Sequence, residues 1–256
     1  MRPQSLEEAW ELNQKKRNRV VAGMMWLKMG THSFNTAIDL CDLGLDAIEE
    51  TEDEFRIGAM VTLRQMEKHP GLGVYSCGAV EDALRDIVGV QFRNGATLGG
   101  SLWRRMGFSD VVAIFLAMDS YVELFKGGVV PLEEFARMPY DNDILVRLIV
   151  KKRPGTFAYQ VVRKQRTDLP TLNCAAAKVG DEYRLVVGSR PARAMLLRDE
   201  RGILAGGITE ESAAAFADYA AGVVSVSGNM WGSAEYRRAL VPVLVRRTLL
   251  ALGEVR

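Results

Sequence analysis

Two glycine-bearing turns, one at residues 20–23 and one at residues 94–101, constrain this chain more than any other feature of its sequence. The first reads Val20-Val21-Ala22-Gly23, and the second contains Thr97-Leu98-Gly99-Gly100-Ser101. Glycine lets a backbone approach a phosphate closely and offer its own N–H groups to the anion. One such turn is weak evidence. Two, each after a short apolar or β-prone run, predict loops that converge on one extended phosphate-bearing ligand such as a dinucleotide.

Length and composition limit the class of protein. The chain has 256 residues, of which 48% are hydrophobic and 25% charged, so it can bury a core in one large domain or two smaller ones. Its net charge of +1 provides no global field for nucleic acid or an anionic membrane. No apolar run approaches the ~20 residues of a membrane-spanning helix, and the acidic N-terminus lacks the apolar segment of a signal peptide. We therefore expect a cytoplasmic protein.

The cysteines and histidines do not predict catalytic chemistry. Cys41, Cys77 and Cys174 are scattered singly, which excludes a disulfide framework and the usual zinc or iron–sulfur ligand spacings, and we expect all three to be buried as small apolar residues. His32 and His69 lie in contexts that favour solvated or structural roles. A nucleophilic triad is therefore poorly supported. Any chemistry should depend on a bound cofactor.

Helix and strand patterns alternate along the first part of the chain. Ser5 with Glu8 and Thr62 with Gln65 have the spacing of capping boxes and predict two helix starts. Asp110 precedes an apolar helical run and is interpreted as its N-cap. Lys126-Gly127-Gly128 predicts a hairpin turn. Strands are predicted at residues 20–22, 34–40, 54–60 and 144–150, and helices between residues 76 and 89 and at residues 111–117.

A polar, Pro- and Gly-punctuated break at residues 151–155 predicts the domain boundary, with domains at residues 1–152 and 153–256. Beyond it, strands are predicted at residues 157–162, 171–179 and 183–187, and helices at residues 210–221 and 233–252. Pro242 should kink the last helix. The fold class is therefore α+β, with an antiparallel sheet covered by helices in the second domain.

These residues carry a family resemblance over nearly the whole chain. Its most specific parts are residues 57–62 and 93–101, and Tyr236-Arg237-Arg238 supports a matching C-terminal domain. In its order of elements the chain resembles the FAD-binding medium subunit of the xanthine dehydrogenase and carbon monoxide dehydrogenase family of molybdenum hydroxylases. The resemblance implies a two-lobed α/β FAD-binding domain of the vanillyl-alcohol oxidase and p-cresol methylhydroxylase type. The second domain is similar to the C-terminal domain of the carbon monoxide dehydrogenase flavoprotein.

The resemblance also implies a role and partners. A large subunit of such complexes holds molybdopterin and hydroxylates the substrate, and a small subunit carries two [2Fe–2S] clusters. The medium subunit passes electrons through noncovalent FAD to NAD or another acceptor. The present chain fits only that last role, because it lacks the cysteine sets of the clusters. The hydroxylated substrate and the acceptor are not specified by this subunit.

The resemblance assigns cofactor-binding residues to both turns and to two further positions. They are Val21, Ala22, Gly23, Met24, Met25, Trp26, Leu27, Thr97, Leu98, Gly99, Gly100, Ser101, Asp110 and Lys164. The family usually has Ala-Gly-Gly-Thr in the first loop, so Met24, Met25 and Trp26 depart from its pattern. Because methionine prefers negative φ, we expect an altered loop path or weakened binding of the diphosphate.

Two alternatives stay open at this stage. The departures at residues 24–26 are also compatible with a subunit that has lost FAD and only scaffolds its partners. A self-sufficient flavin oxidoreductase of the same fold, of the enolpyruvyl-glucosamine reductase type, is the other. The colour of the purified protein distinguishes the first alternative, and activity without partners distinguishes the second.

Overall fold

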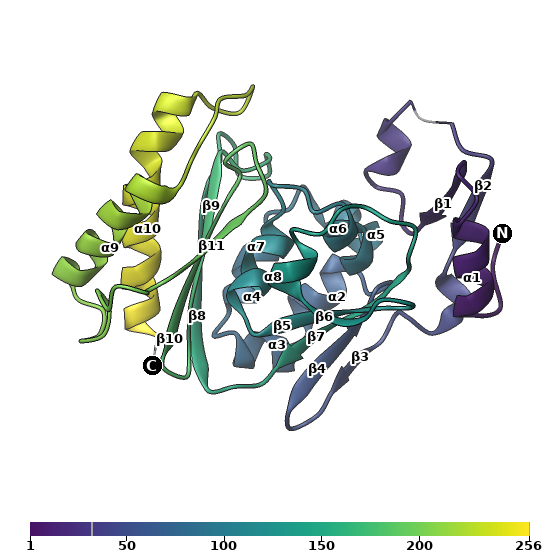
Figure 1. The fold of residues 1–256 in the computed structure, drawn as a ribbon, viewed down its shortest axis with the longest axis horizontal. Coiled ribbons are helices and arrows are strands. Elements are labelled where there is room, and N and C mark those ends of the chain that lie inside the picture. Colours follow the sequence, from purple (N-terminus) through teal and green to yellow (C-terminus); the bar gives the residue numbers. More distant parts are fainter. Residues whose placement is uncertain (32, 256) are drawn as a thin grey trace.

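The structure is a computed structural model that describes residues 1–31 and 33–255. Three parts follow one another along the longest axis of the molecule (Figure 1). A small N-terminal unit contains a two-stranded sheet, a central unit contains a five-stranded sheet, and a C-terminal unit contains a four-stranded sheet. The predicted α+β class is confirmed.

The N-terminal unit holds the first turn. Helix α1 (Leu6–Asn13) precedes β1 (Asn18–Val21), which pairs in parallel with β2 (Thr36–Asp39). Two 3₁₀ turns, η1 (Leu27–Met29) and η2 (Cys41–Leu43), flank β2. β1 begins two residues before the predicted strand at 20–22 and ends one residue earlier, and β2 is shorter than the predicted strand at 34–40. Ser5 caps α1 as expected. The Glu8 carboxylate, however, accepts from the backbone amide of Gln4 at 2.7 Å rather than from that of Ser5, so the second hydrogen bond of the capping box is shifted by one residue.

The central unit is an antiparallel sheet of order β3-β4-β7-β5-β6 with helices packed against it. Its strands are β3 (Ile48–Glu50), β4 (Glu54–Gly58), β5 (Ser120–Leu124), β6 (Gly128–Pro131) and β7 (Leu145–Lys151). Its helices are α2 (Leu63–Lys68), α3 (Pro70–Tyr75), α4 (Ala79–Leu84), α5 (Val90–Gly95), α6 (Leu98–Trp103), α7 (Asp110–Ala117) and α8 (Leu132–Phe135). The predicted hairpin at residues 126–128 joins β5 to β6.

Local sequence explains several of these boundaries. Thr62 and Gln65 form the predicted capping box of α2. The helix predicted between residues 76 and 89 is confined to α4, because Val88 has a φ of 52°, outside the helical region. The N-cap of α7 is Ser109, which accepts from the Val112 amide at 3.2 Å, so the expected N-cap Asp110 is the first residue of the helix instead.

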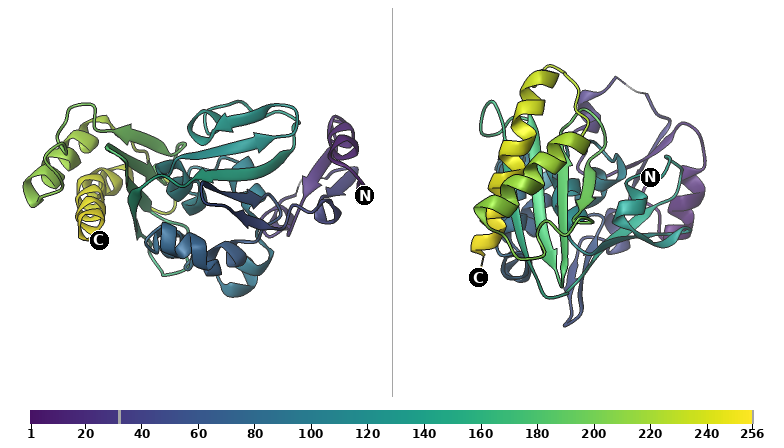
Figure 2. Two further views of the ribbon diagram at one scale, coloured as in Figure 1. Left: turned by 90° about the horizontal axis from the view of Figure 1, so that it is seen from below. Right: turned by 60° about the vertical axis from the view of Figure 1, so that its left-hand side comes forward.

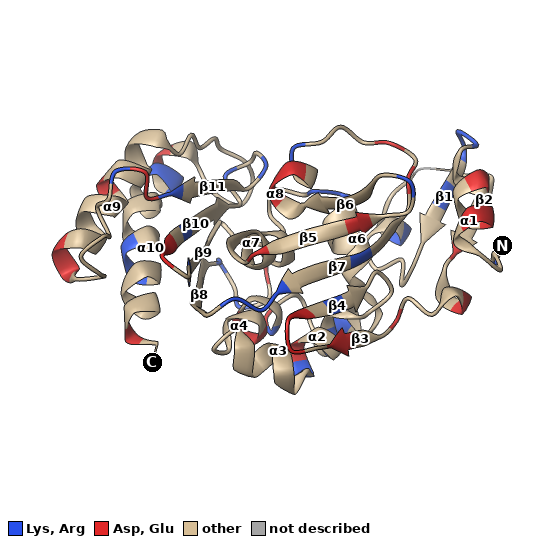
Figure 3. Cartoon of the chain, turned by 60° about the horizontal axis from the view of Figure 1, so that its bottom comes forward, with Lys and Arg blue, Asp and Glu red and all other residues tan. Residues whose placement is uncertain are grey.

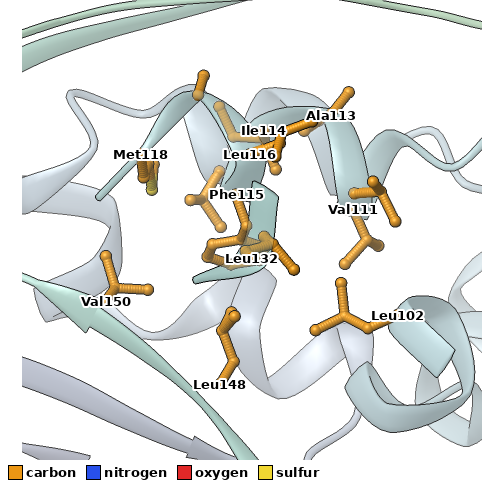
Figure 4. Packing of buried hydrophobic residues seen from close by; sticks show 14 of the residues in the cluster. Leu102, Val111, Ala113, Ile114, Phe115, Leu116, Met118, Leu132, Leu148 and Val150 are labelled. Carbon is orange, nitrogen blue, oxygen red and sulfur yellow. The ribbon is translucent and has the colours of Figure 1, made fainter. Parts of the chain in front are cut away.

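Helix α7 is the centre of the main hydrophobic core. All eight of its residues are buried. Figure 4 shows Ile114, Phe115 and Leu116 of this helix among Leu132, Leu148 and Val150 from other elements. A helix that is apolar on all sides must be covered on all sides. The sheet of the central unit covers one side, and the C-terminal sheet covers another.

The C-terminal unit is a four-stranded antiparallel sheet between two layers of helices. Its order is β11-β10-β9-β8, with β8 (Gly155–Val162), β9 (Leu172–Val179), β10 (Glu182–Gly188) and β11 (Met195–Arg198). Helices α9 (Glu210–Val223) and α10 (Ala234–Glu254) cover one face, and α7 covers the other (Figures 1 and 2). Because both faces of the sheet are buried, the strands show continuous apolar runs rather than strict alternation.

The cysteine expectation is correct for only one residue. Cys174 is buried in β9, and burial raises the pKa of its thiol to about 12. Cys41 and Cys77 are exposed, because they lie in short turns at element ends rather than in strands. His69 is structural, since its Nδ1 accepts from the Leu72 amide at 3.2 Å. His32 lies outside the described residues.

Charged residues of both signs are distributed over all three units (Figure 3). This distribution agrees with the small net charge of +1. Within the part of the chain that the structure describes, no helix is long and apolar enough to cross a membrane.

Candidate functional site

The first loop leaves β1 at Val21 and reaches η1 at Leu27. Met24 has a φ of 54°, the left-handed conformation that costs an L-residue about 1–2 kcal/mol. Met24 stands where the resemblance places a second glycine. The loop therefore takes a turn that favours glycine despite the Cβ of methionine, at the expense of strain.

The backbone amides of this loop are available to a ligand. Within residues 1–31 and 33–255, none of the five amides from Gly23 to Leu27 donates a hydrogen bond to a protein acceptor. The carbonyl of Met24 accepts from the Lys28 amide at 3.1 Å, which closes the turn below them. Successive amides in such a turn form a concavity that binds anions. The loop thus fits the diphosphate of a dinucleotide.

The second glycine-bearing segment is a helix start rather than a loop. Thr97 is the N-cap of α6, and Gly99 and Gly100 lie in its first turn. All four amides from Leu98 to Ser101 donate to protein acceptors: Leu98 to the Val61 carbonyl and Gly99 to the Ala59 carbonyl, each at 2.8 Å, Gly100 to Thr97 Oγ1 at 3.3 Å, and Ser101 to the Thr97 carbonyl at 3.1 Å. Gly99 therefore serves first to let α6 approach the end of β4, where a Cβ would lie 2.8 Å from the Ala59 carbonyl oxygen.

The two segments contact each other directly. A Cβ added to Gly23 would lie 1.7 Å from the carbonyl oxygen of Gly95, the last residue of α5. A Cβ on Gly95 would lie 2.2 Å from Cε of Met25. The predicted convergence of the two turns is therefore present, and it depends on glycine at both contact points.

A buried ion pair holds the second segment in place. Arg93 Nε lies 2.8 Å from Glu67 Oε2, and the two side chains are only 5% and 3% exposed. Arg93 also donates to the Ile87 carbonyl at 3.2 Å. This pair ties α5 to α2 two residues before Gly95. Sequence reasoning missed it, because both helices are rich in polar residues and neither Glu67 nor Arg93 stands out there as buried.

Asp110 is buried at the boundary of the central and C-terminal units. Its carboxylate accepts hydrogen bonds from Tyr159, from Asn173 Nδ2 at 2.9 Å and from Arg163 Nη2 at 2.8 Å. Burial, and then the charge of Asp110, raise the pKa of Tyr159 well above its ordinary value, so its phenol stays a donor. The carboxylate is therefore fully engaged by β8, β9 and the residue that follows β8.

Lys164 begins the loop between β8 and β9. Its Nζ donates to the carbonyl of Met230 at 3.0 Å, and Arg163 donates to the carbonyl of Asp168 at 2.6 Å. The segment that follows reaches a cavity of about 220 Å³. The lining of this cavity includes Phe108, Pro170, Ser189, Trp231 and Arg237.

An aromatic contact connects the first loop to that cavity. The rings of Trp26 and Phe108 meet edge to face, with centroids 5.8 Å apart. The first loop therefore contacts the second segment through Gly23 and Met25 and the lining of the cavity through Trp26. Of the sequence-assigned residues, Gly23 and Met25 of the first loop contact Gly95, two residues before Thr97, whereas Asp110 and Lys164 bond other parts of the protein.

Comparison with known proteins identifies the family. A model described as the FAD binding domain in molybdopterin dehydrogenase matches residues 1–152, and a model described as the CO dehydrogenase flavoprotein C-terminal domain matches residues 157–252. The chain belongs to the FAD-binding medium-subunit family of molybdenum hydroxylases. Members of this family are oxidoreductase subunits of multi-subunit complexes.

Two curated relatives are medium subunits by name. The nicotine 6-hydroxylase medium subunit of Paenarthrobacter nicotinovorans is 27% identical over 98% of this chain and 95% of its own length. The carbon monoxide dehydrogenase medium chain of Hydrogenophaga pseudoflava is 25% identical over 81% of this chain and 77% of its own length. The resemblance predicted from the sequence is therefore confirmed.

Solved structures show the same medium-subunit fold. Carbon monoxide dehydrogenase from Hydrogenophaga pseudoflava superposes with a TM-score of 0.85 at 23% identity, covering 98% of this chain and 95% of that chain. Quinoline 2-oxidoreductase from Pseudomonas putida 86 superposes with a TM-score of 0.85 at 19% identity, covering 99% of this chain and 95% of that chain. The fold is retained although about four residues in five differ.

Proposed function

We propose that this medium subunit binds FAD noncovalently and conducts electrons from the [2Fe–2S] clusters of a small subunit to NAD or another acceptor. The molybdopterin-binding large subunit would hydroxylate the substrate. The observation that supports this role is the run of five amides at residues 23–27 that have no acceptor in the part of the chain that the structure describes. Bound FAD would supply the redox chemistry, because it can exchange electrons singly or in pairs.

The residues of the chain would bind and orient that cofactor. The amides from Gly23 to Leu27 fit the diphosphate, and Leu27 closes the loop on η1. The second segment would form the opposite wall, where Gly100 leaves open space: a Cβ there would meet only Thr97 Oγ1, at 3.4 Å. Ser101 and Thr97 bond each other and fix that wall. The full proposed set is residues 21–27, 97–101, Asp110 and Lys164.

Asp110 and Lys164 would act through the loop between β8 and β9. Asp110 binds Arg163, and Arg163 binds the Asp168 carbonyl at 2.6 Å, which positions the segment that leads to Pro170 and the cavity. The cavity would then accept the ring end of a ligand whose diphosphate lies at the first loop. A cytoplasmic location and the division into domains at residues 152 and 153 stay predictions.

Titration with FAD tests the proposal. We expect the purified chain to turn yellow, to release heat in calorimetry and to lose flavin on acid precipitation, as a noncovalent complex does. A Gly100→Val variant should keep the circular dichroism of the wild type and lose flavin, because the side chain enters the open space. A folded wild-type sample that stays colourless with excess FAD would contradict the proposal.

A scaffold role without FAD is the second candidate. It is favoured by the side chains of Met25 and Trp26, which contact Gly95 and Phe108 across the space between the segments. Reconstitution with the molybdopterin and iron–sulfur subunits distinguishes the candidates, since a scaffold would restore assembly but not electron transfer to an external acceptor. Hydroxylation of a heterocycle or aldehyde by this chain alone would instead favour a self-sufficient flavoenzyme.

A further inference from the structure

The first loop carries two large side chains that lie against the second segment and its continuation. Cε of Met25 occupies the position 2.2 Å from where a Cβ of Gly95 would be, and its Cγ and Sδ lie within 3.4 Å of that point. The side chain of Met25 therefore lies against Gly95, which is half-buried. This glycine ends α5, two residues before the N-cap of α6.

Trp26 makes the second contact. Its indole meets the ring of Phe108 at 65° with centroids 5.8 Å apart, and Phe108 lines the cavity. Trp26 is still 42% exposed, so few contacts hold it. An extended ligand that runs from the loop amides to the cavity would have to separate these two rings.

The same residues therefore carry two opposing properties. Their backbone amides donate to no acceptor within residues 1–31 and 33–255, and their side chains contact Gly95 and Phe108 next to the loop. Met24, the residue before them, has a φ of 54°, so the turn that leads into both side chains is in the left-handed conformation. A ligand gains the amides only when Met25 and Trp26 move.

We propose that the side chains of Met25 and Trp26 form a cover that competes with FAD for the surface between the two segments and thereby sets its affinity and association rate. The inference rests on the proposed flavin role. The apparent Kd equals the intrinsic Kd divided by the fraction of molecules in which the cover is open. A cover that is closed in about nine molecules of ten therefore weakens binding about tenfold. Replacing Met25 and Trp26 with smaller side chains should therefore strengthen FAD binding by about the same factor.

Stopped-flow flavin fluorescence on the full chain measures this effect. We expect Met25→Thr and Trp26→Ser each to raise the association rate and to lower the Kd for FAD about threefold, and the double variant about tenfold. Met29→Thr is the matched control, because Met29 lies in the same loop region and is 73% exposed. It should bind FAD as the wild type does. Thermal unfolding of each variant confirms that the fold is kept.

A mutant cycle tests the contact itself. Phe108→Leu removes the partner of Trp26 from the other side, so it should speed FAD association as Trp26→Ser does, and the two changes together should add nothing further. Additive effects would overturn the cover, because they would show that the two rings act separately.

The remaining outcomes separate this inference from the proposed function. Slower or weaker FAD binding by the Met25 and Trp26 variants, beside a wild type that binds, would overturn the cover and leave the flavin role intact. Binding by the double variant but not by the wild type would overturn the proposed flavin role, because the natural chain would then not bind FAD, and with it a cover that only tunes the affinity. Failure of every variant to bind would overturn the flavin role, and the cover with it.

Discussion

In the loop at residues 23–27 five successive amides have no acceptor among the described residues, whereas in the first turn of α6 the amides from Leu98 to Ser101 are all engaged. Both segments are marked by glycine next to small residues, and both belong to the same candidate site. The difference shows that a glycine pattern can serve two purposes. In the first loop it exposes donors, and in the second it lets a helix start lie against a strand.

The largest expected effect is at the contact between the segments. A Gly23→Ala change places a Cβ 1.7 Å from the Gly95 carbonyl oxygen, where neither backbone can yield easily. We expect the free energy of unfolding to fall by about 3 kcal/mol, the upper end for overpacked sites, with loss of flavin. Urea denaturation measures it. Gly73→Ala is the control, because a Cβ there meets nothing within 4 Å. If both changes lowered the free energy of unfolding equally, the close contact between residue 23 and the Gly95 carbonyl would not be the cause.

The second prediction separates two adjacent glycines of α6. At Gly99 a Cβ would lie 2.8 Å from the Ala59 carbonyl oxygen, but at Gly100 the nearest atom would be 3.4 Å away. Gly99→Ala should therefore lower the free energy of unfolding by about 2 kcal/mol. Gly100→Ala should leave it unchanged or raise it slightly, since alanine favours helix. If Gly100→Ala were the more destabilising change, the assignment of Gly99 to packing would be wrong.

The third prediction concerns the cap that engages the amides of α6. Thr97→Val keeps the shape of the side chain and removes the oxygen that accepts from the Gly100 amide at 3.3 Å. Loss of an N-cap costs about 1 kcal/mol, which chemical denaturation can measure. Thr97→Ser should retain most of the stability. Because the change also frees one amide, flavin affinity in Thr97→Val tests whether α6 can bind an anion once its donor is released.

The smallest expected effect is at Met24. Relief of its positive φ by Met24→Gly should gain about 1–2 kcal/mol, offset by the roughly 0.5–1 kcal/mol that glycine loses in backbone entropy. We expect a net gain below about 1 kcal/mol, measured by thermal unfolding, and slightly tighter FAD binding. Met29→Gly lacks a positive φ to relieve and should be slightly destabilising. A loss of stability in Met24→Gly would show that the loop is not strained.

Elements with strong local signals were predicted from the sequence. The capping box at Thr62 and Gln65, the apolar run of α7 and the hairpin at residues 126–128 were found close to their actual positions. Each depends on contacts within a few residues, which a sequence pattern records. The family resemblance extended these local signals to the whole chain, and the family models match residues 1–152 and 157–252.

Several short helices, and the burial of individual side chains, were not predicted from the sequence. Helices α3, α5 and α6 have six residues each and are held mainly by tertiary contacts, so their propensities alone are uninformative. The exposure of Cys41 and Cys77 was missed because burial depends on which turn covers a residue. The roles of Asp110 and Arg163 were missed for the same reason: the groups that surround them come from strands about fifty residues away.

The sequence by itself determined that this chain has two glycine-bearing segments, an α+β fold and a place among the medium subunits, because these depend on local residue patterns and their order. Only the tertiary structure decided which amides are free. Val61 and Ala59, from the strand end before α2, engage the amides of Leu98 and Gly99, and no protein acceptor within the described ranges reaches those of residues 23–27. A hydrogen bond requires a partner within about 3 Å, and the fold alone brings such partners together.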